Sequence, residues 1–351
     1  MKWNKRIVDR AAIGALAFAM VMTSGCGAKK EESHGQITVI VKSQDPYWDS
    51  VKKGADEAAD ELGYTIDWQA PENENIAQNS YVETAVHNGT KAILVAPSVA
   101  DGLDDSFKMA ADSEIPILAI DTDIDSEYKE SCLATNQDAA GGIAARETLQ
   151  LLPQGGQIAV MGHMQDSPTA IGRFGGYFAN LPHTNTTGFS LPAGYDDSTV
   201  LDEETGAGLA RTGTPVFDLV DIRFCDNNAD VAVDETKAML EAHPDIKVIY
   251  CTNQTSTVGV GRAINELGYK EQVQVVGFDS SDEEIDFVQK GVLDGIVVQN
   301  PYNMGYLGVR YAVKSINGYS IPSGIDTGAT FVTKDNLENP EVQMLLHPEN
   351  Y

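Results

Sequence analysis

Basic residues are scarce in this chain of 351 residues, in which 24 lysines and arginines stand against 52 aspartates and glutamates. The net charge of −28 argues against nucleic-acid binding, because phosphate recognition requires a basic face. The six histidines and four cysteines show no HxxxH, HxH or CxxC spacing, so neither a metal centre nor another cofactor is expected. No glycine-rich phosphate loop follows the first predicted strand. Residues 43–50, SQDPYWDS, place an acid, a proline and two aromatic rings there instead.

Long apolar runs are also scarce, and the one at Ala11–Met22 is too short to span a bilayer as a permanent helix. It follows a segment with four basic residues and precedes the sequence TSGC at 23–26, a pattern that resembles a bacterial lipoprotein signal. The resemblance implies an extracytoplasmic protein that is anchored to the cell membrane, with a signal peptide at 1–25, lipid on Cys26 and a tether that completes residues 26–36. Thr23 stands where an aliphatic residue is usual, so a plain secretory signal is the alternative.

Three further cysteines, Cys132, Cys225 and Cys251, remain. We expect them to be small buried residues. Because their number is odd, at least one thiol is free or pairs with another molecule.

Strand and helix patterns alternate along the chain after residue 36. The apolar runs predict strands at 37–42, 64–69, 91–96, 116–121, 157–162, 217–224, 246–252, 273–278 and 294–299. Helical patterns fill most of the gaps, and the first, over 47–62, ends at Gly63, a usual C-terminal cap. This alternation favours parallel sheets covered on both faces, and nine strands fit two α/β units with a break near 122–140. Residues 179–215 show no sustained period, so low order is predicted there.

Eight ordered motifs resemble the ribose-type periplasmic sugar-binding proteins, the soluble receptors of carbohydrate ABC transporters, from residue 36 to about 350. They are DPYWDSVKKGADEAADELGY, NGTKAILVAP, IPILAID, TNQDAAGG, RFGGY, CTNQTSTVGVGRAINELG, VVGFDSS and VLDGIVVQNPYNMGYLGV. The resemblance implies the type I periplasmic binding protein fold, an α/β fold of two similar doubly wound parallel-sheet lobes with a three-segment hinge and a ligand cleft between the lobes. It assigns 37–135 and 300–325 to the N-terminal lobe and 136–299 and 326–351 to the C-terminal lobe, with 179–215 as a disordered insertion.

Polar side chains just past the predicted strands are the candidates for ligand binding, because ligands of open α/β sheets lie beyond the carboxyl ends of the strands. These candidates are Asp45, Asp121, Asn136, Asn227, Asn253, Asp279 and Gln299. Carboxylates and amides can each hydrogen-bond to neighbouring hydroxyls of a sugar. Tyr47 and Trp48 can pack on the apolar faces of the sugar ring. Arg173 completes the predicted site, either as a ligand contact or as a support for its helix.

Several of these residues have a structural alternative. Asp45 can cap the helix that begins at Pro46. Tyr47 and Trp48 can pack inside the lobe, although we expect both to face the cleft, with Trp48 ahead of Tyr47. Asp226 or Asn228 replaces Asn227 as the ligand residue if the strand register differs by one position.

The chain departs from the ribose-binding members at two positions. Thr122 stands where those proteins have an arginine directly after the acid that matches Asp121, and Ile171 replaces a second arginine, two positions before Arg173. Arginine is a rigid fork of donors, so its loss implies a different set of hydrogen bonds. A pentose, a hexose and a sugar-like polyol all stay open as ligands.

The leading interpretation is a monomeric solute-binding lipoprotein, not an enzyme, that captures a monosaccharide or polyol and delivers it to an ABC permease. The alternative is a sugar or quorum-signal receptor that feeds a chemoreceptor or sensor kinase. A transcription regulator with the same two lobes would need a basic helix-turn-helix at its N-terminus. An exported glycoside hydrolase could pair Asp45, Asp121 and Asp279, but no nucleophile elbow, metal set or phosphate loop accompanies them.

Overall fold

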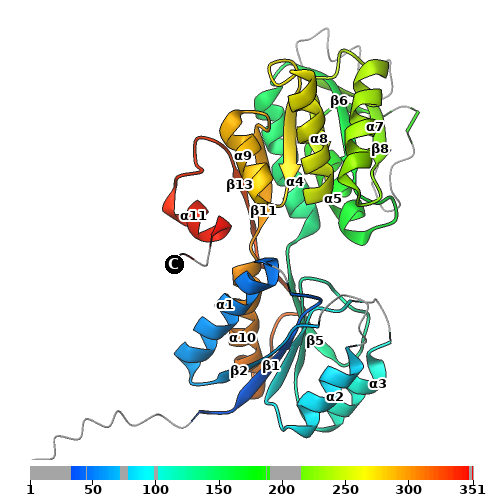
Figure 1. Ribbon diagram of the computed structural model, residues 1–351. Helices are drawn as coiled ribbons and strands as arrows, with labels where there is room; N and C mark the ends of the chain where they lie inside the picture. Colours follow the sequence, from blue (N-terminus) through cyan, green and yellow to red (C-terminus); the bar gives the residue numbers. More distant parts are fainter. Residues whose placement is uncertain are drawn as a thin grey trace, which may run out of the picture. The chain divides into compact units, whose positions relative to one another are not determined.

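The computed structural model describes residues 33–44, 46–71, 78–98, 102–186, 188–189, 215–347 and 350. The predicted signal peptide, Cys26 and Asp45 lie outside these residues. Ser33–Tyr351 forms one compact unit that contains two β-sheets (Figure 1). We call each sheet with its helices a lobe. Among the described residues, no helix combines the length and the apolar character that crossing a membrane would require.

The N-terminal lobe is built on six parallel strands in the order β12-β5-β4-β3-β1-β2. The strands are β1 (Gln36–Ile40), β2 (Thr65–Gln69), β3 (Ala92–Val95), β4 (Ile117–Ile120), β5 (Lys129–Ala134) and β12 (Gly324–Asp326). Its helices are α1 (Pro46–Leu62), α2 (Asn79–His87), α3 (Asp104–Asp112) and α10 (Pro301–Ile316). In Figure 1, α1 and α10 lie on one face of the sheet and α2 and α3 on the other. Side chains alternate between the faces, so Val39 packs in the core with α1 and α10, and Ile40 packs in the core with α2 and α3.

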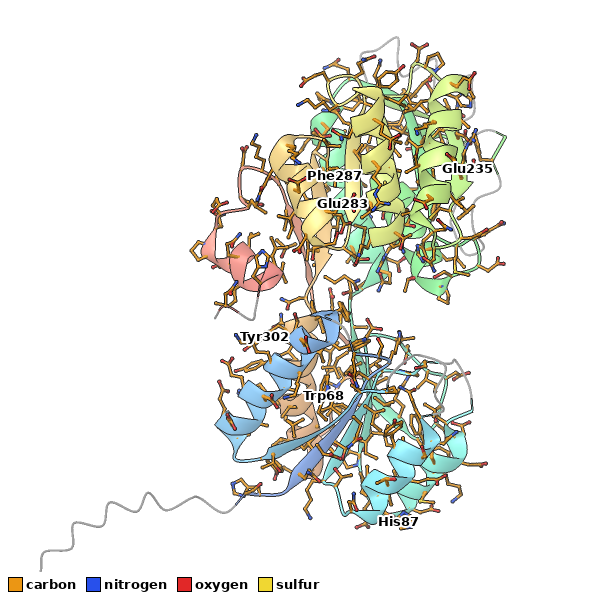
Figure 2. The ribbon with its side chains drawn as sticks, viewed as in Figure 1. Trp68, His87, Glu235, Glu283, Phe287 and Tyr302 are labelled. Atoms are coloured by element: carbon orange, nitrogen blue, oxygen red, sulfur yellow. The ribbon has the colours of Figure 1, made fainter. Side chains whose placement is uncertain are left out.

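The C-terminal lobe is built on seven strands in the order β13-β11-β10-β9-β6-β8-β7, of which only β13 runs antiparallel to its neighbour, among the residues described. The strands are β6 (Gly155–Gly162), β7 (Thr184–Asn185), β8 (Val216–Phe224), β9 (Val248–Cys251), β10 (Gln274–Phe278), β11 (Gly295–Gln299) and β13 (Ala329–Val332). The helices are α4 (Gln137–Leu151), α5 (Pro168–Asn180), α7 (Ala229–Ala242), α8 (Gln254–Leu267), α9 (Asp282–Lys290) and α11 (Pro340–Leu346). Phe287 of α9, labelled in Figure 2, belongs to one of the two cores that cover this sheet.

The chain passes between the two sheets three times: after β5, after β11 and between β12 and β13. Asp326 joins two of these crossings, because its Oδ1 accepts the backbone N–H of Asn136 at 3.1 Å and that of Gly328 at 2.9 Å. Two parallel-sheet α/β lobes with three crossings confirm the predicted fold class.

A pair of helices crosses at glycines in each lobe. A Cβ atom added to Gly305 of α10 would lie 1.9 Å from the carbonyl oxygen of Val51 in α1, and the facing Gly54 is equally crowded. In the other lobe, a Cβ on Gly176 of α5 would lie 1.9 Å from the carbonyl oxygen of Asp138 in α4. The helix backbones therefore touch, and only glycine leaves room for the contact.

The structure differs from the sequence-based expectations in several elements. Strands β5, β7, β12 and β13 were not predicted, and β7 occupies part of the stretch 179–215 for which low order was expected. That expectation is wrong for residues 179–180, which end α5, and for residues 184–185, which pair in parallel with β8. Residues 187 and 190–214 lie outside the described part of the chain. Cys132, Cys225 and Cys251 are buried, as predicted, and all three are free thiols.

Candidate ligand-binding site

Four residues that follow the strands have left-handed backbone. Asp121 comes after β4 with φ 64°, Asp279 after β10 with φ 72°, and Asp226 and Asn227 after β8 with φ 48° and 54°. Non-glycine residues adopt positive φ infrequently, and such positions cluster at ligand sites, where the fold holds the strain. Three of the four are residues that the sequence predicted to bind ligand: Asp121, Asn227 and Asp279.

The N-terminal lobe surrounds the Asp121 carboxylate with donors. The Tyr47 hydroxyl donates to Oδ1 at 2.7 Å, and Lys42 Nζ and the Thr122 hydroxyl donate to Oδ2 at 2.9 and 2.8 Å. Burial alone would raise the pKa of Asp121, but the charge and hydrogen bond of Lys42, with the two hydroxyls, hold it below its ordinary value. Burial raises the pKa of Tyr47 and Asp121 adds to the shift, so the hydroxyl stays protonated.

The C-terminal lobe surrounds the Asp279 carboxylate in a similar way. Gln299 Nε2 donates to Oδ1 at 2.6 Å, and the backbone N–H of Gln254 donates to Oδ2 at 3.2 Å. Arg173 Nη1 lies 3.8 Å from the same Oδ2. Asp279 follows β10 and Gln299 ends β11, and the hydrogen bond between them brings these two predicted ligand residues together.

Arg173 lies inside the C-terminal lobe with only 4% of its surface exposed. Its Nε donates to Gln137 Oε1 at 2.7 Å, its Nη1 donates to the carbonyl of Thr252 at 2.6 Å, and its guanidinium lies 3.7 Å from the centre of the Phe278 ring. Arg173 thus places its positive charge near the Asp279 carboxylate from inside the lobe. Direct contact of Arg173 with ligand stays a prediction.

Three amide residues hold helix ends or each other. Asn253 caps α8 through its Oδ1, which accepts the N–H of Ser256, and its Nδ2 donates to Asn227 Oδ1 at 3.0 Å. This pair places two predicted ligand residues side by side. Asn136 caps α4 by accepting the N–H of Ala139, and it lies at a crossing between the sheets.

The two aromatic rings of SQDPYWDS have different surroundings. Trp48 is 5% exposed and packs in the core of the N-terminal lobe, edge-on to Tyr47 at 4.9 Å between ring centres. Tyr47 is half-buried and directs its hydroxyl at Asp121. Their burial therefore does not support the expectation that Trp48 faces the cleft ahead of Tyr47. Contact of either ring with ligand stays a prediction.

Two residues at the strand ends were missed. Lys42 follows β1 and pairs with Asp121, and the predicted strand 37–42 had enclosed it within the strand. His163 follows β6, and its ring bonds to the hydroxyls of Thr252 and Ser167. His163 directly follows β6 and so fits the rule that selected Asp279, whereas Lys42 lies two residues past the end of β1.

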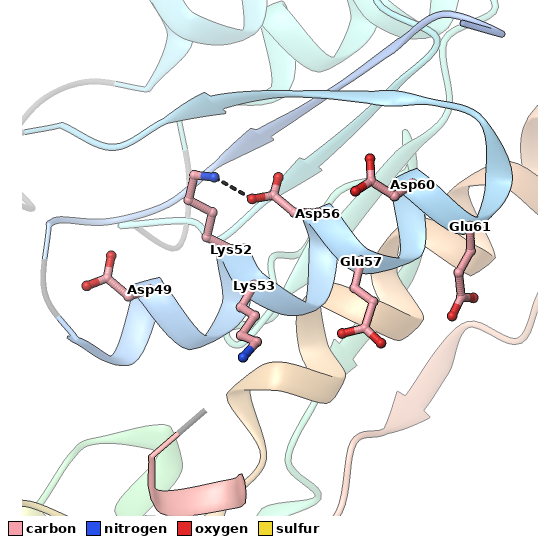
Figure 3. A pocket seen from close by; sticks show the side chains of 7 residues that line it. All are labelled: Asp49, Lys52, Lys53, Asp56, Glu57, Asp60 and Glu61. Carbon is pink, nitrogen blue, oxygen red and sulfur yellow. Dashed lines mark hydrogen bonds and ion pairs between the residues drawn. The ribbon is translucent and has the colours of Figure 1, made fainter. Parts of the chain in front are cut away.

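The hollow in Figure 3 lies on the outer side of α1 and measures about 580 Å³. It is lined by Asp49, Lys52, Lys53, Asp56, Glu57, Asp60 and Glu61. Because all of these belong to one helix, no second element encloses a ligand there, and none is a candidate from the strand ends. Within the described residues, no group of three histidine, cysteine or acidic side chains could hold a metal ion.

The comparisons with known proteins agree on one family. The model of the periplasmic binding protein domain matches residues 37–320. The ribose import binding protein of Salmonella typhimurium is 24% identical over 92% of this chain and 98% of its own length. The D-allose-binding periplasmic protein of Escherichia coli is 26% identical over 92% of this chain and 96% of its own length.

A solved structure extends the likeness to the fold. The ABC transporter solute-binding protein from Agrobacterium vitis with bound D-fucose is 31% identical, has a TM-score of 0.66, and is matched over 89% of this chain and 100% of its own. The expectation of a binding protein rather than an enzyme is confirmed by this kinship. The chain belongs to the ribose-type family of periplasmic sugar-binding proteins.

Proposed function

We propose that this chain is an extracytoplasmic solute-binding lipoprotein that captures a neutral monosaccharide or similar polyol between its lobes and delivers it to an ABC importer. The ligand residues are Asp45, Tyr47, Trp48, Asp121, Asn136, Arg173, Asn227, Asn253, Asp279 and Gln299, with Lys42 added, and Cys26 carries the lipid.

One observation carries the sugar proposal. Each lobe presents a carboxylate on a left-handed backbone position at the carboxyl end of its sheet, Asp121 in one and Asp279 in the other. Fixed carboxylates with amides beside them can each accept from neighbouring hydroxyls, which is the hydrogen-bonding pattern of a polyol.

The charges favour a neutral ligand. Lys42 pairs with Asp121, and Arg173 lies near Asp279, so each carboxylate is balanced within its own lobe. No cation at these two positions is left to neutralise an anionic ligand such as a sugar acid or a sugar phosphate. Hinge closure would then remove water around the bound sugar and strengthen these hydrogen bonds.

A thermal-shift screen of residues 27–351, which contain the whole compact unit, tests the proposal. The panel is D-ribose, D-arabinose, D-allose, D-fucose, D-galacturonate and D-ribose 5-phosphate. We expect a neutral sugar at a hundredfold its Kd to stabilise the protein by about 2.7 kcal/mol and the two anions to give no shift. A shift from the anions alone would contradict the proposal, and so would the absence of a shift from every sugar in the panel.

The variant Asp279→Ala sharpens the screen. The Asp279 carboxylate accepts from Gln299 and from the backbone of Gln254, and truncation to alanine leaves these donors without their acceptor. We expect the sugar-dependent shift to disappear, equivalent to at least a hundredfold weaker Kd, since hydrogen bonds to a charged group are worth about 1.5–3 kcal/mol each. The exposed Asp282→Ala, three residues away, is the matched control and should keep the shift.

A further inference from the structure

The loop between β6 and α5 is anchored by His163, which is 5% exposed. The backbone N–H of His163 donates to Thr252 Oγ1 at 3.0 Å, and its ring Nδ1 lies 2.8 Å from the same oxygen. Because the hydroxyl already accepts the backbone N–H, its proton is best directed at Nδ1, which leaves the ring proton on Nε2 to donate to Ser167 Oγ at 3.0 Å. Both ends of this loop are thereby fixed.

Met164 follows this anchor, and 44% of its surface is exposed. Its sulfur accepts from Asn227 Nδ2 at 3.2 Å, and the backbone N–H of Asn227 donates to the carbonyl of His163 at 3.1 Å. Asn227 in turn accepts from Asn253 at 3.0 Å. The methionine therefore stands in one row with two amides at the carboxyl end of the sheet.

A sugar site also needs apolar surface for the C–H faces of the ring. Trp48 lies in the core of the N-terminal lobe, so its exposed area is small. Large apolar side chains that the described residues expose are Met109, Met164, Val231, Leu267, Tyr319 and Met344. Of these, Met164 is the one with a hydrogen bond to a candidate ligand residue.

We propose that Met164 contacts the bound ligand and covers apolar C–H surface of a sugar, which makes it a specificity-determining residue of the site. This inference rests on the proposed function. Methionine has a flexible, polarizable side chain that adapts to different shapes. The site therefore accepts sugars that differ in the outline of the covered face, while the fixed carboxylates and amides select the arrangement of hydroxyls.

Methyl NMR of residues 27–351 labelled with 13C-methyl methionine tests the contact directly. D-fucose, D-arabinose and D-allose are added in turn, and the Met164 signal is assigned with Met164→Leu. A sugar that binds should shift the Met164 methyl signal and leave those of Met109 and Met344, exposed on α3 and α11, in place. A saturating sugar that leaves the Met164 signal unmoved overturns the inference.

Two substitutions separate apolar contact from the bond to Asn227. Met164→Ala should raise Kd on the order of tenfold, because each buried methylene-sized group is worth roughly a fourfold change in Kd. Met164→Leu loses the sulfur acceptor and keeps the apolar bulk, so its Kd should stay within about threefold of wild type. Met344→Ala is the matched control and should leave Kd unchanged.

Equal weakening by Met164→Leu and Met164→Ala would show that the residue acts through Asn227, and it would overturn the proposed contact. A wild-type protein that shows no thermal shift with any neutral sugar contradicts the proposed function itself. That result is read before any variant is compared, so the two failures are distinguishable.

Discussion

At the scale of single residues, Lys42 decides the charge state of Asp121. Burial pushes the pKa of this carboxyl upward, and Lys42 is the largest of the causes that reverse the shift. Because the folded-state pKa is lowered, Asp121 stays ionised until the pH falls below its ordinary value of 3.8. Sugar binding should therefore be insensitive to the titration of Asp121 over the neutral and mildly acidic range.

Replacing Lys42 with methionine should reverse this behaviour. Without the cation, burial dominates and the pKa of Asp121 rises, so affinity for the sugar should fall as the pH drops from 8 to 4.5. Calorimetric titration at several pH values measures the profile. Lys108→Met, which removes an exposed partner of Asp112, serves as the control. Identical profiles for wild type and Lys42→Met would exclude this role of Lys42.

Glu284 is a buried acid outside the site, with none of its surface exposed. Burial raises its pKa well above 4.5, although the Ser281 hydroxyl, which donates to Oε2 at 2.7 Å, opposes the shift. A raised folded-state pKa gives stability that is fully present below pH 4.5 and is lost as the pH rises toward the folded value. Glu284→Gln keeps the shape and removes the titration.

We therefore expect Glu284→Gln to gain on wild type as the pH rises, by up to about 1.4 kcal/mol of unfolding free energy for each pH unit in that window. Urea unfolding at pH 5, 6.5 and 8 measures the difference. Glu283 provides the control: the Arg262 guanidinium donates to its carboxylate and lowers its pKa. Glu283→Gln should therefore show no such gain. A constant difference between Glu284→Gln and wild type would contradict the prediction.

Much of the site could be predicted from positions after strands, because the β/α architecture places those residues at one edge. Asp121, Asn227, Asn253 and Asp279 follow this rule, Gln299 ends β11, and all five make the contacts described above. To predict which of the two aromatic rings is buried, the helical phase of α1 must also be considered. Trp48, Val51, Ala55 and Ala58 recur at helical spacing on the buried side of α1, which leaves Tyr47 beside the stripe.

At the scale of the elements, the glycine crossings carry a stability prediction. Gly176→Ala should destabilise the C-terminal lobe by about 1–3 kcal/mol, because its Cβ would overlap the carbonyl of Asp138 and α5 would have to move away from α4. Urea unfolding followed by circular dichroism measures the loss.

The neighbouring Gly175 provides the matched control. Its added Cβ would meet only Asp138 Oδ1 at 3.5 Å, an ordinary contact. Gly175→Ala should therefore be neutral or stabilise the helix by up to about 1 kcal/mol, since alanine is the better helix former. Equal destabilisation by both substitutions would mean that the crossing is not the cause.

The elements that escaped prediction are short strands. β5 begins with Lys129 and Glu130 and has a serine at its centre, so it shows neither an apolar run nor an alternation. β12 and β13 have only three and four residues and form where the chain crosses from one sheet to the other. They pair with β5 and β11, which are remote in sequence, and a local sequence pattern carries no information about such contacts.

At the scale of the whole molecule, the proposed lipid on Cys26 can be tested in bacteria that produce the full chain. The protein should incorporate radiolabelled palmitate and partition into the detergent phase of Triton X-114, because two acyl chains give stable membrane anchoring. Cys26→Ser should abolish both behaviours.

Cys225→Ser changes a buried thiol and is the control, with labelling expected to match wild type. Export of an unlabelled chain by the wild type would instead favour the plain secretory signal that Thr23 leaves open.

The N-terminal lobe takes its last helix and its edge strand from the far end of the chain. Met304, Val309 and Ala312 of α10 fill the core that Val39 and Trp48 begin, and β12 completes the sheet beside β5. During synthesis or passage through a membrane, this lobe therefore cannot close its core until residue 326 has emerged. The lobe that starts first is thus completed only near the end of the chain, shortly before β13 and α11 complete the other lobe, so the exporting cell has nearly the whole chain available before an intact N-terminal lobe can resist translocation.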